Sequence, residues 1–211
     1  MKRGKFIVIE GCEGSGKSTV IERLKEKYPD ALFTREIGGT EFAEKGPRYL
    51  VLTSPFSKDL NGYEQVTQAF SGRSHHLRKV VEPALTEGRN VFCDRFDASS
   101  WAYQIFGMEC HHLFGLFDSL RASLVPQIVP DLYIILDISP EEGMKRVAAR
   151  KAETGVTNYF DERGADLHAR VRDGYRRFAE KNADRVKVID AHPSKEAVWE
   201  SVEKVLDPLF G

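Results

Sequence analysis

Short runs of β-branched and aromatic residues alternate along the chain with longer segments in which apolar residues recur at helical spacing. The short runs predict strands at 6–9, 32–34, 90–93, 132–136 and 186–189. The longer segments predict helices at 19–27, 64–86, 141–151, 166–180 and 194–206. Strands that are separated by helices pair in parallel, because a parallel connection needs a crossover of a dozen or more residues. The pattern therefore predicts a three-layer α/β fold, with a five-stranded parallel sheet flanked by helices.

One polar stretch interrupts this alternation. Residues 151–158 have weak periodicity and lie between two predicted helices, so we expect a short lid at about 151–160. The chain has 211 residues, which favours a single domain over 1–211.

Composition and charge exclude several classes of protein. Lys and Arg number 31 against 32 Asp and Glu, whereas a protein that binds nucleic acid normally has a basic excess. No apolar run approaches the ~20 residues that cross a membrane. The three cysteines, Cys12, Cys93 and Cys110, are odd in number and lack Cys-x-x-Cys spacing, which disfavours disulfides and a zinc site. We therefore expect a cytoplasmic protein with no nucleic-acid or membrane partner.

The segment after the first predicted strand carries the strongest chemical signal. It fits the P-loop pattern G-x-x-x-x-G-K-[ST] and precedes a predicted helix, where backbone N–H groups and the helix N-terminus form a cradle for phosphates. We expect Lys17 to reach the β- and γ-phosphates of a nucleotide and Ser18 to bind Mg²⁺. The alternative is a glycine-rich turn without a ligand. The predicted nucleotide-binding residues are Gly11, Glu13, Gly14, Ser15, Gly16, Lys17, Ser18 and Thr19.

A second acidic residue is expected near the metal. Asp94 follows the strand at 90–93, and the carboxyl ends of parallel strands meet at the edge of the sheet where ligands collect. Asp94 is thus either a metal ligand or a helix N-cap. The neighbouring Arg95 has a guanidinium that can grip a phosphate in a bidentate manner.

Several segments together resemble the thymidylate kinase family over nearly the whole chain. They include Thr-Arg-Glu-Ile-Gly-Gly-Thr at 34–40, Asp-Arg-Phe at 94–96, Ser-Ser-Trp-Ala-Tyr-Gln at 99–104 and His-Ala-Arg-Val-Arg-Asp-Gly-Tyr at 168–175. The resemblance implies a P-loop kinase fold, a homodimer, and ATP-dependent phosphoryl transfer to dTMP that gives dTDP and ADP.

The resemblance also implies roles for individual residues. Glu13 would accept a hydrogen bond from the 3′-hydroxyl of the acceptor nucleotide, and Arg73 and Arg95 would hold its 5′-phosphate, with Arg95 catalytic. Ser100 and Gln104 match positions that contact the thymine base.

Glu36 matches a carboxylate that helps to organise the metal and water. Where the family has a phenylalanine that stacks on the base, this chain has Ala69, with Phe70 next to it. Phe70 is expected to stack in its place only if the helix is locally rewound, since one residue turns a side chain by ~100°. There is also one extra residue between Glu36 and Arg48 compared with the family spacing.

Some members of the family carry an arginine in the P-loop, where this chain has Gly14, so another cation must neutralise the γ-phosphoryl group. Tyr159 occupies a lid position where an arginine is often found. The remaining candidates are Arg146, Arg150, Lys151 and Arg163, and we expect the catalytic one to be Arg150. Two other functions stay open, namely a P-loop kinase for another nucleotide or a deoxynucleoside, and a P-loop NTPase that acts as a switch or binding protein.

Overall fold

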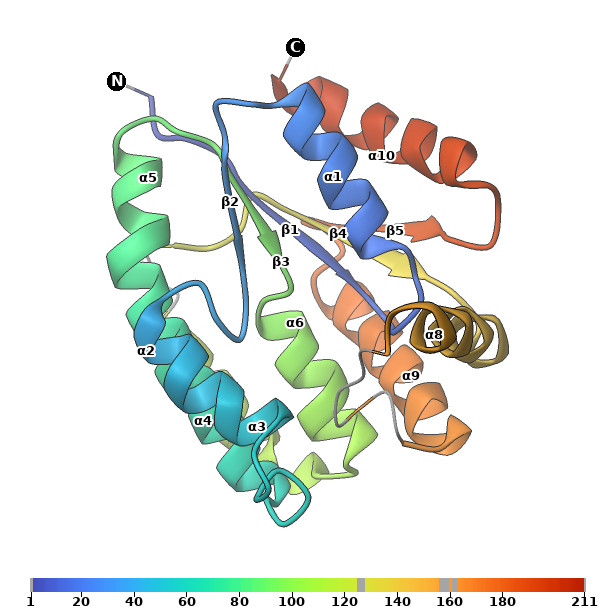
Figure 1. Cartoon of the computed structure of the whole chain (residues 1–211). Helices are drawn as coiled ribbons and strands as arrows, with labels where there is room; N and C mark the ends of the chain where they lie inside the picture. Colours follow the sequence, from blue (N-terminus) through green and yellow to red (C-terminus); the bar gives the residue numbers. More distant parts are fainter. Residues whose placement is uncertain (1, 125–127, 156–159, 161–162, 211) are drawn as a thin grey trace.

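The computed structural model describes residues 2–124, 128–155, 160 and 163–210. Its centre is a parallel five-stranded sheet in the order β2-β3-β1-β4-β5, which confirms the predicted fold (Figure 1). The strands are β1 Phe6–Gly11, β2 Leu32–Arg35, β3 Val91–Asp94, β4 Leu132–Asp137 and β5 Val186–Asp190. All five extend one or two residues beyond the predicted carboxyl ends, so Gly11, Asp94 and Asp137 are the last residues of their strands.

All five predicted helices are present. The helices are α1 Lys17–Lys27, α2 Glu41–Ala43, α3 Tyr49–Leu52, α4 Gly62–His76, α5 Glu82–Thr86, α6 Asp97–Ser100, α7 Phe114–Leu124, α8 Pro140–Thr154, α9 Ala165–Lys181 and α10 Lys195–Phe210. The chain also forms π-helical turns at Glu44–Arg48, Leu77–Val81 and Trp101–Gly107, and a 3₁₀ turn at His111–Leu113. The predicted helix at 64–86 is thus one helical run made of α4, a π-turn and α5.

Three helical runs, at 41–52, 97–107 and 111–124, are absent from the sequence prediction. The run at 97–107 has no polar face, because every residue of Trp101–Gly107 is buried, and a helix without such a face gives no hydrophobic period. The run at 41–52 contains Pro47, which disrupts an ordinary α-helix and lies here in a π-turn.

Aromatic side chains mark the two faces of the sheet. On one face the Phe92 ring packs against Tyr28 after α1, at 5.3 Å between centroids, and Phe210 of α10, at 6.0 Å. On the other face Tyr133 packs against Phe178 of α9, at 5.3 Å. Helices α1 and α10 accordingly cover one side of the sheet, and α6 and α9 cover the other (Figure 1).

The lid region differs from its prediction at its start. Helix α8 continues to Thr154, and Gly155 ends it in the left-handed conformation, with φ of 68°. The first four residues of the predicted lid are therefore helical, and Tyr159 lies outside the described residues. Phe160 is buried, and its ring meets Tyr103 edge-on at 4.8 Å. In the part of the chain that the structure describes, no helix is long and apolar enough to cross a membrane.

Candidate active site

The P-loop connects the end of β1 to the start of α1. Gly16 precedes α1 with φ of 89°, and Gly14 has φ of 74°, a left-handed conformation that suits glycine. A Cβ on Gly14 would lie 2.3 Å from the carbonyl oxygen of Gly143 in α8, so the loop packs directly on the first turns of that helix. The Ser15 hydroxyl is buried and has no hydrogen-bond partner among the described residues, which suits a loop built to receive phosphate oxygens.

Lys17 is held inside this loop. Its side chain is buried, and Nζ donates to the backbone oxygens of Gly11 at 2.9 Å and Cys12 at 3.1 Å. Burial lowers the pKa of Lys17, and the positive charge of Arg95 lowers it further. The ammonium group is therefore fixed at the loop by carbonyl groups that a phosphate can replace.

Asp94 ends β3 beside β1 and β2, where it pairs in register with Ile9 and Arg35. Its Oδ1 is buried and has no hydrogen-bond partner among the described residues. The N-cap alternative is wrong, because the Glu10 carboxylate accepts from the N–H groups of Phe96 at 2.7 Å and Ser99 at 3.0 Å instead. Asp94 is thus available for another ligand.

Arg95 forms the edge of the site next to the P-loop. Its φ of 68° is unusual for a residue with a side chain, and strain of this kind gathers at functional sites. Its Nη2 donates to Glu13 Oε1 at 2.6 Å, and Nη1 donates to the Tyr175 hydroxyl at 3.1 Å and to Ser99 Oγ at 3.2 Å. Contacts from the P-loop, α6 and α9 therefore fix this guanidinium.

Glu13 is an ionised partner in this arrangement. Burial alone would raise the pKa of Glu13, but the charges of Arg95 and Lys17, a hydrogen bond from Tyr103 and the charge of Arg150 together lower it to about 2. The Tyr103 hydroxyl donates to Glu13 Oε1 at 3.0 Å. A carboxylate that is ionised at neutral pH can accept a hydrogen bond from a ligand hydroxyl.

A second group of predicted site residues surrounds Arg73. Arg73 is only 1% exposed, and its guanidinium carbon lies 4.5 Å from the centre of the Phe70 ring and 5.0 Å from that of Phe96. Its Nε donates to Glu36 Oε2 at 2.7 Å and Nη2 donates to Ser100 Oγ at 3.1 Å. The remaining nitrogen, Nη1, is buried and has no partner among the described residues.

For three predicted site residues, the structure shows contacts within the protein. Helix α4 is regular over Gly62–His76, so the rewinding on which base stacking by Phe70 depends is absent, and the Phe70 ring packs edge-on against Phe117 at 5.4 Å. Both carboxylate oxygens of Glu36 are occupied, by Arg73 and by His76, so Glu36 contacts α4. Gln104 donates to Gln65 Oε1 of α4 at 3.2 Å. Metal organisation by Glu36 and base contact by Gln104 stay predictions, whereas the rewinding that Phe70 would need in order to stack on the base is not found.

The extra residue before Arg48 is absorbed by the π-turn Glu44–Arg48, since a π-turn accommodates one more residue than an α-turn. Arg48 consequently returns to the loop after β2, where Nη1 donates to the Ile37 carbonyl at 2.7 Å. Burial and the charge of Arg35 lower the pKa of Arg48, and the charges of Arg95 and Asp94 also act on it. Arg48 therefore lies at the same edge of the site.

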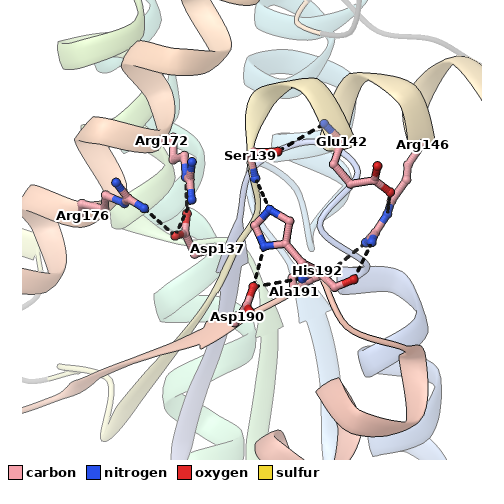
Figure 2. A network of polar contacts seen from close by, with 9 residues as sticks. All are labelled: Asp137, Ser139, Glu142, Arg146, Arg172, Arg176, Asp190, Ala191 and His192. Atoms are coloured by element: carbon pink, nitrogen blue, oxygen red, sulfur yellow. Dashed lines mark hydrogen bonds and ion pairs between the residues drawn. The ribbon is translucent and has the colours of Figure 1, made fainter.

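Two of the candidate lid cations, Arg146 and Arg150, have different surroundings on α8. Figure 2 shows Arg146 bound to Glu142 at 2.9 Å and to the carbonyls of Ala191 at 3.1 Å and His192 at 3.4 Å, which ties α8 to the segment after β5. Arg150 lies one turn further along, and its charge is one of those that lower the pKa of Glu13. The catalytic role of Arg150 stays a prediction.

Three contributors to the site were missed from the sequence, namely Glu10, Tyr175 and His76. Glu10 directly follows the apolar run at 6–9, and this position was the available signal. A charge buried in a central strand needs polar partners. Tyr175 and His76 lie on helices, and their partners come from distant segments, so no local pattern indicates these contacts.

Comparison with known proteins agrees with this geometry. The sequence model of the thymidylate kinase family matches residues 9–202. A thymidylate kinase of Marinomonas sp. (strain MWYL1) is 37% identical over 211 residues, which cover 98% of this chain and 96% of that protein. A thymidylate kinase of Nitrobacter hamburgensis is 40% identical over 194 residues, covering 90% of this chain and 82% of that protein.

Among solved structures, the crystal structure of thymidylate kinase from Ehrlichia chaffeensis superimposes with a TM-score of 0.71 at 30% identity. The superposition covers 97% of this chain and 99% of that chain. Family model, relatives and fold all agree over nearly the full length, and the chain belongs to the thymidylate kinase family.

Proposed function

We propose that the protein transfers the γ-phosphoryl group of ATP to dTMP and releases dTDP and ADP. The observation that carries this proposal is the Arg95–Glu13 pair, at 2.6 Å, which borders the P-loop that holds Lys17. It places a phosphate-binding guanidinium beside a phosphate cradle. Arg73 is bound to Ser100 and has one nitrogen, Nη1, without a partner among the described residues, which could donate to an acceptor nucleotide.

The chemistry needs positioned charge more than it needs a base. The acceptor phosphate is already ionised at neutral pH, so its oxygen attacks the γ-phosphoryl group in line through a loose transition state. Lys17 supplies charge at the cradle, and Arg95 holds the attacking phosphate in place. Phe160 of the predicted lid packs on Tyr103 next to Glu13, which supports a lid that excludes water from this step.

Mg²⁺ fits the oxygen groups that the site offers. Asp94 has a buried carboxylate oxygen without a partner among the described residues, and Ser18 is exposed at the start of α1. Mg²⁺ prefers oxygen ligands and is commonly held by one or two protein groups together with nucleotide phosphates. We propose that Ser18 and Asp94 hold the ion, which would neutralise charge on the transferred group.

The test is ADP release measured with ATP alone and then with dTMP, dCMP, dGMP or thymidine as acceptor. We expect release to depend on dTMP and to exceed that with the other bases, since a base contact is worth about 1–3 kcal/mol, or roughly 5–150-fold. Equal rates with all three nucleotides would remove the base assignment. Turnover without any acceptor would favour an NTPase, and turnover with thymidine would favour a deoxynucleoside kinase.

Replacement of Arg95 by lysine should weaken the use of dTMP much more than the binding of ATP. Lysine keeps the charge but has no planar fork, so it cannot reproduce the contacts to Glu13, Ser99 and Tyr175 while gripping a phosphate. We expect KM for dTMP to rise about tenfold or more, as the loss of a charged hydrogen bond suggests. A loss that appeared mainly as weaker ATP binding would place Arg95 on the donor side.

We also propose a homodimer in a cytoplasmic setting. Four aromatic side chains, Phe42, Tyr49, Phe56 and Tyr63, are each about half exposed on α2, α3, α4 and the segment between them. These helices lie along one side of the molecule (Figure 1), and an exposed apolar patch of this kind suits a subunit contact. The three cysteines are unpaired, which suits a reducing compartment.

A further inference from the structure

A chain of hydrogen-bonded side chains leads from Thr34 in β2 to Arg73. Thr34 Oγ1 lies 2.7 Å from His76 Nε2, and His76 Nδ1 lies 2.9 Å from Glu36 Oε1. Glu36 Oε2 accepts from Arg73 at 2.7 Å. The side chains of His76, Glu36 and Arg73 are each at most 1% exposed, so no solvent substitutes for these contacts.

The chemistry of the partners fixes the proton on His76. Arginine is always charged, and its bond to Glu36 requires a carboxylate, which only accepts hydrogen bonds. His76 Nδ1 must therefore carry a proton and donate it to Oε1. When the ring is neutral, Nε2 has no proton and accepts from the Thr34 hydroxyl.

The ring of His76 also has a fixed place. A Cβ on Gly39, whose φ is 76°, would lie 2.5 Å from two atoms of the His76 ring. The neighbouring His75 contacts Thr40 Oγ1 at 3.1 Å. The end of α4 is thus packed against the loop that follows Glu36, and the imidazole cannot swing away from the carboxylate.

Glu36 depends on this contact for its orientation. Without His76, Oε1 would be a buried carboxylate oxygen with no partner, and the carboxylate would turn toward another donor. Such a turn would move Oε2 and release Arg73 Nε. The nitrogen of Arg73 that lacks a partner, Nη1, would then lose its fixed direction.

We infer that His76 is a positioning residue, which orients Arg73 toward the acceptor nucleotide through Glu36. The inference rests on the proposed function, in which dTMP is the acceptor. The two ring nitrogens have different roles. Nδ1 orients Glu36 through its hydrogen bond, whereas Nε2 only forms a hydrogen bond with Thr34.

Two substitutions separate the nitrogens. In H76N, an amide N–H replaces Nδ1–H at the same distance from the backbone and keeps the Glu36 contact. In H76Q, the amide lies at the position of Nε2, so it keeps the Thr34 contact and loses Glu36. We expect KM for dTMP to rise about 10–100-fold in H76Q, as the loss of a hydrogen bond to a buried charge suggests, and less than threefold in H76N. KM for ATP should change little in both variants.

T34V is the matched control, because it removes the Thr34 contact and leaves Nδ1 in place. It should behave like H76N. A role in packing alone predicts the opposite order, because glutamine is closer in volume to histidine than asparagine is. Equal KM values for dTMP in H76N and H76Q, or better function in H76Q, would overturn the inference.

Nitrogen NMR of the wild-type protein gives a second readout that does not depend on whether the variants fold. We expect the His76 signal to report a protonated Nδ1, and an unprotonated Nδ1 would overturn the inference. The proposed function fails separately, through a wild-type protein that shows no dTMP-dependent ADP release.

Discussion

Replacement of Lys17 by alanine is expected to lower kcat by about 10³-fold, the scale seen when one group that stabilises transition-state charge is removed. This corresponds to about 4 kcal/mol in the activation barrier. The physical reason is the position of Nζ, 2.9 Å from the Gly11 carbonyl inside the phosphate cradle. No other described lysine donates to these P-loop carbonyls.

The fold should survive this change. Lys17 lies at the open edge of the sheet, and its Nζ contacts only backbone oxygens of the loop among the described residues. A thermal melt of K17A should therefore remain cooperative. K25A is the matched control, since Lys25 is on the same helix but exposed, and it should keep nearly full activity. An unfolded K17A protein, or one with near-normal kcat, would contradict the assignment.

Replacement of Arg150 by alanine should have an effect of similar size, with kcat lower by ~10³ or more, as for arginines that stabilise a transferring phosphoryl group. Gly14 leaves the P-loop without a cation at that position, and its contact with Gly143 allows no side chain there. Arg150 lies on α8, the same helix that contacts Gly14 through Gly143, and its positive charge lowers the pKa of Glu13. Charge that acts in the transition state should change kcat and leave nucleotide affinity nearly constant.

The control for Arg150 is its exposed neighbour Lys151, whose replacement by alanine should change kcat little. Steady-state kinetics and equilibrium ATP binding, measured for both variants, separate a catalytic loss from a binding loss. If R150A retained most of its kcat, Arg150 would be removed from the mechanism, and attention would shift to Arg146 or Arg163.

The sequence predicts the sheet well because its strands are short apolar runs, and their parallel pairing follows from the helices between them. It misses Trp101–Gly107 because a helix that is buried on every side has no polar face to set a period. It also cannot show that a π-turn at Glu44–Arg48 compensates for an inserted residue, since that geometry depends on contacts with α4.

At the site, motif and strand position place Lys17, Asp94 and Arg95 at one edge, because the carboxyl ends of parallel strands meet there. The hydrogen-bond partners within the site could not be predicted in the same way. Glu10 and not Asp94 accepts from the N–H groups at the start of α6, and His76 reaches Glu36 across 40 residues of sequence. Such pairings arise from tertiary packing, so no local pattern in the chain encodes them.

The most direct test of the central claim follows the γ-phosphate itself. ATP labelled at that position is incubated with the protein and dTMP, and the label is then located in the products. We expect label in dTDP, in an amount equal to the ADP formed and with little in inorganic phosphate. Label that appears in inorganic phosphate at the same rate with or without dTMP would contradict it.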